Sequence, residues 1–184
     1  MPASSFAKSA LVVTAALAVM PVSFAWAIDK SEYNTTKSRI EADYKADKDA
    51  CNALKHNEKD VCVEQAKGKE KVAKAELEFN YSGKEADRVK LMEAKADANY
   101  AVAKEQCDDK AGNDKSVCVK EAKATHTTAM ADAKASKKIT EARVDAADDK
   151  RDANYKVAVQ KCDALAGTAK DNCIAAAKAQ YGKS

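Results

Sequence analysis

Six cysteines are the residues of this chain whose type and spacing point most directly to chemistry. They form three pairs with one spacing, in the stretches "CNALKHNEKDVC" (51–62), "CDDKAGNDKSVC" (107–118) and "CDALAGTAKDNC" (162–173). Cysteine thiols bind metals, exchange electrons or form structural disulfides. The spacing contains neither the short knuckle of a zinc site nor the C-x-x-C of redox and haem sites. We therefore expect structural disulfides, and no metal or cofactor, at these positions.

Six cysteines can pair in many ways, and sequence alone does not choose among them. The repeat favours pairing within each copy, which gives Cys51 with Cys62, Cys107 with Cys118, and Cys162 with Cys173. Closing a loop of about a dozen residues stabilises a fold by roughly 3 kcal/mol in the chain-entropy model. Such bonds persist in an oxidising compartment.

The N-terminal segment has the layout of a secretory signal. A lysine precedes an apolar run over residues 10–20, and a proline and the small-residue pattern Ala25-Trp26-Ala27 follow it. This predicts a signal peptide over residues 1–27, cleaved after Ala27 or after Ala25. The apolar run is far shorter than the ~20 residues of a spanning helix. We expect no stable membrane insertion after cleavage and a periplasmic or secreted location.

The predicted mature chain, residues 28–184, is expected to be all-α. It contains no proline, and it is rich in alanine, lysine and glutamate, which are strong helix formers. Its repeat units run at about 28–83, 84–138 and 139–184. We expect three tandem, disulfide-stapled antiparallel helical hairpins that form an elongated helical bundle. Large aliphatic side chains are few, so the disulfides compensate for a thin core.

The repeat extends beyond the cysteines. Tyr44, Tyr100 and Tyr155 each stand at the same position ahead of the first cysteine of their copy, so the three copies align on these tyrosines as well. Two helical turns separate each tyrosine from its cysteine, so both side chains lie on one helix face. In every copy an alanine stands one turn after the second cysteine, on the same face: Ala66, Ala122 and Ala177.

Residues inside each cysteine bracket predict a chain reversal. Gly112 and Gly167 occupy the same place midway between their two cysteines, where a helix end commonly needs a left-handed residue. The first copy has His56-Asn57 there, and asparagine is the next best choice for that conformation. The expected caps of the following helices are Asp114, Asp171 and either Asn57 or Asp60.

The two junctions between units leave two architectures open. Ser82-Gly83 can break or kink a helix, whereas the junction near Lys138 has neither glycine nor proline. If both junctions are continuous, 62–107 and 118–162 become two long antiparallel helices of about 45 residues, roughly 65 Å each. If both break, three short hairpins result. We favour the elongated version, with Gly83 as the place for a kink.

Charge is almost balanced, with 32 basic and 29 acidic residues in the whole chain. The signs are interleaved, as in "KEADRVKLMEAKAD", which is typical of a solvated helix surface. A nucleic-acid binder is expected to gather its positive charge into a basic stripe with stacking aromatics. We therefore expect no nucleic-acid partner.

No constellation of reactive residues is evident in the sequence. His56 and His126 are far apart, share no motif, and are interpreted as ordinary surface residues. A nucleophilic site needs serine or cysteine beside a positioned histidine and carboxylate, which the sequence does not indicate. The acidic runs lack the glycine turn of a calcium loop, so we interpret them as solvated helix faces: Asp108-Asp109 and Asp148-Asp149-Asp152. We expect no catalytic, cofactor-binding or metal residues, and no enzyme.

The helical composition of residues 28–184 resembles that of two groups of proteins. It is similar to the periplasmic helical domain of TolA-type envelope proteins, and to late-embryogenesis-abundant stress proteins. It departs from the first because we expect no retained anchor and no C-terminal globular domain, and from the second because its cysteines are paired. The hairpins also resemble twin C-x9-C proteins of the mitochondrial intermembrane space, although those carry two cysteine pairs per hairpin.

Two functions are compatible with these observations. The first is a non-enzymatic exported helical protein with a structural or envelope-stress-protective role. The alternative is a periplasmic binding or adaptor module that presents the repeated tyrosine face to an unidentified envelope protein or to peptidoglycan.

Overall fold

The computed structural model describes residues 28–183, so the predicted signal peptide over residues 1–27 lies outside the described residues. Within that range the chain forms five α-helices and two short 3-10 turns and no strand, which confirms the all-α class. The helices are α1 (Lys30–Ala50), α2 (His56–Ser82), α3 (Glu85–Gln106), α4 (Gly112–Cys162) and α5 (Gly167–Tyr181).

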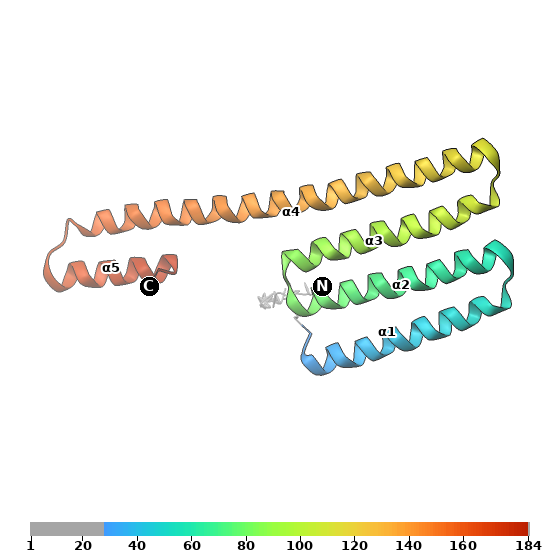
Figure 1. Cartoon of the computed structure of the whole chain (residues 1–184). Coiled ribbons are helices and arrows are strands. Elements are labelled where there is room, and N and C mark those ends of the chain that lie inside the picture. The colour runs from blue at the N-terminus through green and yellow to red at the C-terminus, as the bar shows by residue number, and fades with distance from the viewer. Residues whose placement is uncertain (1–27, 184) are drawn as a thin grey trace, which may run out of the picture.

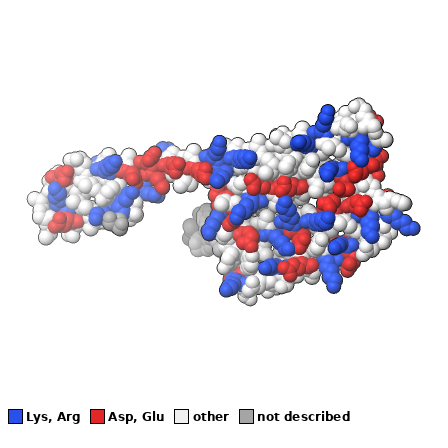
Figure 2. All heavy atoms as spheres, viewed as in Figure 1, with Lys and Arg blue, Asp and Glu red and all other residues white. Residues whose placement is uncertain are grey.

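The first four helices lie side by side, alternating in direction, in a single layer (Figure 1). Each helix packs against the next one along the chain, from α1 to α5. The second half of α4 runs on beyond the layer, and α5 folds back along its far end (Figure 1). Two hairpins therefore stack in the layer, and the third projects from it. On the side of the layer shown in Figure 2, basic and acidic side chains alternate.

All three cysteine brackets reverse the chain in the same way. The residue at the midpoint of the bracket has positive φ in every copy, 56° at Gly112 and 57° at Gly167. This confirms the prediction for both glycines. In the first copy the left-handed residue is His56, with φ 52°, and not Asn57. The position within the turn therefore decides the conformation, even though histidine adopts it less readily than glycine.

The predicted helix caps are wrong. α2, α4 and α5 each follow an extended residue whose side chain makes no capping hydrogen bond. Because each helix starts at its left-handed residue, Asp114 falls inside the first turn of α4 and Asp171 lies beyond the first turn of α5, so neither stands ahead of its helix. The side chain of Asn57 instead donates to the Glu105 carbonyl oxygen at 3.0 Å, which ties the first cysteine bracket to the last turn of α3.

The two junctions behave differently. Gly83 has φ +61° and its N–H donates to the Phe79 carbonyl at 2.8 Å, so α2 ends there and α3 returns along it. The kink allowed at Gly83 is therefore a full reversal, and the long helix over 62–107 is divided. Near Lys138 the helix continues, and α4 spans 51 residues, roughly 77 Å. The long helix over 118–162 is confirmed.

The core is thin and made largely of small side chains. At the closest approach of α2 and α3, a Cβ built on Gly68 would lie 2.9 Å from the Ala98 Cβ. The largest fully buried side chains are three cysteines, Cys51, Cys107 and Cys162. The other buried apolar residues are Ile40, Ala66, Leu77, Val89, Leu91, Ala94, Ala96, Ala133 and Ala177. The disulfides are therefore part of the core as well as crosslinks.

Candidate functional site

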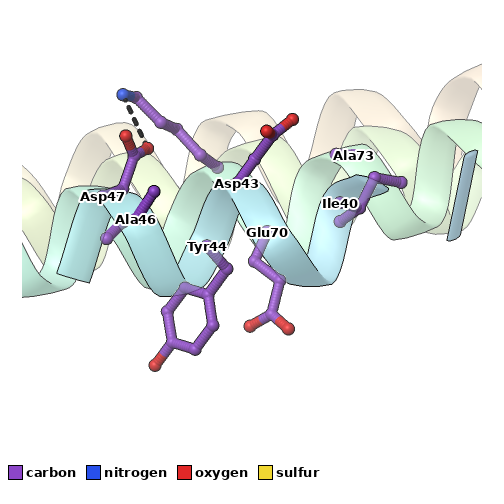
Figure 3. A pocket seen from close by; sticks show the side chains of 9 residues that line it. Ile40, Asp43, Tyr44, Ala46, Asp47, Glu70 and Ala73 are labelled. Atoms are coloured by element: carbon purple, nitrogen blue, oxygen red, sulfur yellow. Dashed lines mark hydrogen bonds and ion pairs between the residues drawn. The ribbon is translucent and has the colours of Figure 1, made fainter. Parts of the chain in front are cut away.

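A groove lies between the two helices of the first hairpin, close to its disulfide. It has a volume of about 350 Å³. It is lined by Ile40, Asp43, Tyr44, Ala46, Asp47, Ala66, Lys69, Glu70 and Ala73. Figure 3 shows the Tyr44 and Glu70 side chains pointing the same way, while Asp47 forms an ion pair with Lys69 at 3.0 Å. The repeated tyrosine is thus part of a groove wall.

The same groove recurs in the second hairpin at equivalent residues. It has a volume of about 180 Å³. Its lining residues are Ala96, Asn99, Tyr100, Ala103, Ala122, Thr125, His126 and Ala129. When the copies are aligned on their cysteines, each of these occupies the position of a lining residue of the first groove. We call this feature the repeat groove.

The third hairpin also carries the repeat groove, in a larger form of about 490 Å³. In the same alignment, several of its lining residues occupy positions that line the second groove: Asn154, Ala158, Ala177, Gln180 and Tyr181. Tyr155 stands near this groove, with its ring centroid 6.3 Å from that of Tyr181. The hairpin interior is thus copied three times.

A constant frame and a variable lining make up the repeat groove. The tyrosine before the first cysteine and the alanine after the second are the same in all copies. The residue one turn beyond that alanine differs, and is Glu70, His126 or Tyr181. The first groove therefore presents mainly carboxylates and a lysine, and the second presents asparagine, threonine and histidine. The third presents asparagine, glutamine, tyrosine and a lysine. Copies that share a frame but differ in lining offer different hydrogen-bonding groups.

The second groove shows that the interpretation of His126 as an ordinary surface residue is wrong. Its side chain is 24 % exposed, its Nε2 lies 2.7 Å from Asp97 Oδ1, and its ring centroid is 5.0 Å from that of Tyr100. The other Asp97 oxygen accepts from Lys71 Nζ at 2.7 Å. The hydrogen bond from Lys71, and then that from His126, hold the pKa of Asp97 below its ordinary value. His56, by contrast, is exposed.

The position of His126 relative to the repeat is the signal that sequence reasoning missed. In each copy, the residue one turn beyond the repeated alanine lies opposite the repeated tyrosine. In the second copy that residue is His126. A hydroxyl that serves as a nucleophile must hydrogen-bond to its base. Thr125, the hydroxyl neighbour in this groove, donates instead to the Glu121 carbonyl at 3.1 Å. The side chains of the groove form hydrogen bonds and an aromatic contact, as His126 does with Asp97 and Tyr100.

The acidic runs are engaged in ion pairs rather than in a shared site. Asp148 pairs with Arg151 at 2.6 Å, and Asp108 with Lys115 at 3.0 Å. Asp152 pairs with Lys183 of the returning chain, whose hydrogen bond lowers the pKa of the carboxyl. Within residues 28–183, no group of three or more His, Cys, Asp or Glu residues is arranged to hold a metal ion.

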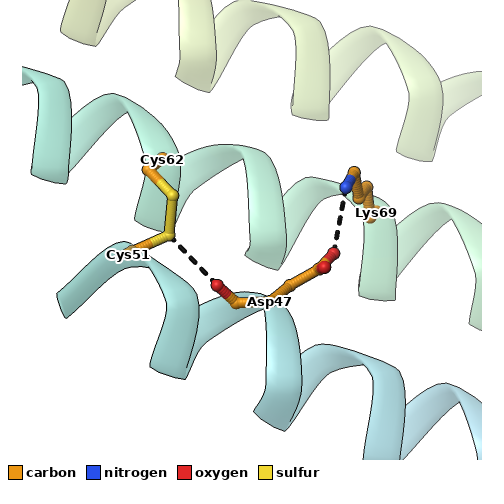
Figure 4. The surroundings of a disulfide bond; sticks show 4 residues. All are labelled: Asp47, Cys51, Cys62 and Lys69. Atoms are coloured by element: carbon orange, nitrogen blue, oxygen red, sulfur yellow. Dashed lines mark hydrogen bonds and ion pairs between the residues drawn. A yellow bond between two sulfur atoms is a disulfide. The ribbon is translucent and has the colours of Figure 1, made fainter. Parts of the chain in front are cut away.

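Three disulfides close the necks of the hairpins, in the predicted pairing. The Cα–Cα distances are 5.6 Å for Cys51–Cys62 and 5.7 Å for each of the other two pairs, Cys107–Cys118 and Cys162–Cys173. Figure 4 shows the first, which joins α1 to α2 next to Asp47. No described cysteine is free. Structural disulfides of this kind indicate an oxidising, extracytoplasmic location.

No protein-family model, curated protein or solved structure matches the chain. None of the described helices is both long and apolar enough to cross a membrane. The fold and the crosslinks define a disulfide-stapled helical repeat protein.

Proposed function

We propose that this chain is a non-enzymatic exported protein, periplasmic or secreted, with a structural or envelope-stress-protective role. The observation that carries the proposal is the distribution of its crosslinks. A disulfide closes each of the three cysteine brackets, while the unbroken α4 joins the layer to the projecting hairpin. This arrangement holds two helical bodies at a fixed separation, as a spacer does.

The surface supports the same proposal. The charges are interleaved, and several ion pairs join two exposed side chains, so the molecule keeps a hydrated exterior over a thin core. Two measurements test the proposal. Small-angle scattering of the oxidised protein should give a maximum dimension set by α4. A strain that lacks the gene should grow poorly under osmotic, oxidative or metal stress, and unimpaired growth under all three would remove the stress-protective role.

A second candidate is a binding or adaptor module, and the recurrence of the repeat groove favours it. Three grooves with one frame and different linings fit recognition of a partner at several points, such as an envelope protein or peptidoglycan. Crosslinking pull-down from an envelope extract tests this role. The triple variant Tyr44→Ala, Tyr100→Ala, Tyr155→Ala should lose a stoichiometric partner that the wild type captures, while Tyr81→Ala, outside the grooves, keeps it. Failure of the wild type to capture any stoichiometric partner would remove this candidate.

A further inference from the structure

An exposed face of α4 carries an apolar stripe along most of the helix, and its last member, Val157, also lines the edge of the third groove. Ala124, Ala135, Ala146 and Val157 recur at one constant interval of three helical turns. That interval corresponds to about 3.67 residues per turn, which keeps the stripe nearly straight along the helix. The complete α4 stripe is Val117, Ala124, Ala131, Ala135, Ile139, Ala142, Ala146, Ala153 and Val157, and every member is exposed. Exposed aliphatic side chains in a row mark an interaction surface.

The equivalent face is covered in the first part of the chain. The first half of the stripe corresponds to the face of α2 that packs on α3, and the second half to the face of α3 that packs on α2. Alignment of the copies matches Val117 and Ala124 to Val61 and Gly68, and Ala146, Ala153 and Val157 to Leu91, Ala98 and Val102. Leu91 is 8 % exposed. One helix thus carries both sides of the α2–α3 interface.

The junctions explain why these two half-faces do not meet within the chain. The reversal at Gly83 lays α3 against α2. At the second junction α4 continues as one helix. The two halves of its stripe therefore lie on the same side of that helix and cannot pack against each other. Midway between them lies Ile139, which is 52 % exposed.

We propose that the α4 stripe binds the α4 stripe of a second copy of this chain in antiparallel orientation. Such a pair reproduces the α2–α3 interface twice, with Ala124 of each copy opposite Ala153 of the other, as Gly68 lies opposite Ala98. The two Ile139 side chains then meet near the two-fold axis. This is the geometry of a domain-swapped pair, in which an interface made within one chain is made between two.

Length favours a second copy as the occupant. The stripe covers most of the 51 residues of α4, and the next longest described helix, α2, has 27 residues. Only another α4 matches the stripe from end to end among the described helices. The partner's layer and projecting hairpin lie on the far side of its own α4, so nothing in the described fold obstructs the approach.

Charges beside the stripe favour the antiparallel orientation. With Ala124 opposite Ala153, Lys134 lies near Asp145 of the other copy, and Asp132 lies near Arg143. Lys138 meets a basic residue of the other copy in either orientation, Lys138 in the antiparallel pair and Arg143 in a parallel one, so the orientation rests on the two opposite-charge pairs. Flanking charges of this kind set orientation in paired helices. The inference uses only α4 and does not depend on the proposed function.

Light scattering coupled to size exclusion tests the pair with two matched variants of the oxidised protein. Ile139→Glu places two like charges at the axis and should raise the dimer dissociation constant by roughly 100-fold. Val144→Glu is the control, because Val144 is 55 % exposed in the same stretch of α4 but lies off the stripe. Circular dichroism should show equal helicity for both. A monomeric wild type, or equal dissociation constants for the two variants, would overturn the proposal.

A photo-crosslinking amino acid at position 124 tests the orientation. In the antiparallel pair the crosslinked peptide should contain Ala153 of the other copy. A crosslink between two 124 positions would show a parallel pair and would overturn the proposal. A crosslink to α1 or α2 of the other copy would also overturn it, because it would place a different face of the partner on the stripe.

Discussion

The third disulfide should hold α5 in place almost alone, and the double variant Cys162→Ala, Cys173→Ala tests this. α5 has 15 residues and packs only against the end of α4. The buried residues of this hairpin are Cys162, at 1 % exposed, and Ala177, at 5 %. A helix this short is marginal without tertiary support. We expect α5 to open locally in the double variant.

The magnitude follows from the size of the closed loop. The sequence separation of the bridged cysteines is 11, and closing a loop of that size stabilises by about 3 kcal/mol in the chain-entropy model. An opening free energy that falls by this amount raises amide exchange by roughly 100-fold. Hydrogen exchange followed by mass spectrometry should show that increase in peptides from Gly167–Tyr181, with little change in α1, α2 and α3.

The second disulfide supplies the matched control. Its cysteines have the same sequence separation of 11, but α3 is held on both sides, by α2 and by α4. Cys107→Ala, Cys118→Ala should therefore lower global stability without selective opening of one helix. Exchange in α5 that stays unchanged in the Cys162 and Cys173 variant would refute the reasoning, and so would equal local opening in the two variants.

Three further predictions concern individual residues. Hydrogen bonds from its lysine and histidine partners lower the pKa of Asp97. These interactions therefore stabilise the folded state above about pH 4, and the stabilisation is lost as pH falls through the lowered pKa. Urea titrations of Asp97→Asn should therefore show a deficit at neutral pH that vanishes in acid, and Asp49→Asn, an exposed control in α1, should show none. Gly68→Val should lower the free energy of unfolding by about 1–3 kcal/mol, because its Cβ would lie 2.9 Å from that of Ala98, and Ala98→Gly should recover part of the loss. Gly83→Ala should cost about 1–2 kcal/mol in the same assay, because φ there is +61°; an unchanged stability would show that the reversal does not depend on glycine.

Local features of the sequence were sufficient to predict the cysteine pairing and the left-handed glycines. Both depend on short stretches, in which the repeat fixes spacing and glycine has a distinct conformational range. The helix caps failed because the turn residue itself begins the helix, which moves Asp114 and Asp171 inside it. The repeat groove needed a comparison across two helices. Its tyrosines were identified, but the residues that face them, such as His126, were not.

The outcome at the two junctions could not be predicted from either junction alone. A kink at Gly83 would have left Leu91 in water, whereas the reversal lays α3 along α2, and Leu91 is only 8 % exposed. At the second junction the burial available is smaller, because the stripe offers mostly alanines where α2 and α3 have Phe79 and Leu91. A lysine there would also have to adopt a left-handed conformation, at about 1–2 kcal/mol. The smaller burial and the higher cost of the turn both favour a continuous helix at the second junction. The α4 stripe, which a third stacked hairpin would have covered, therefore stays exposed.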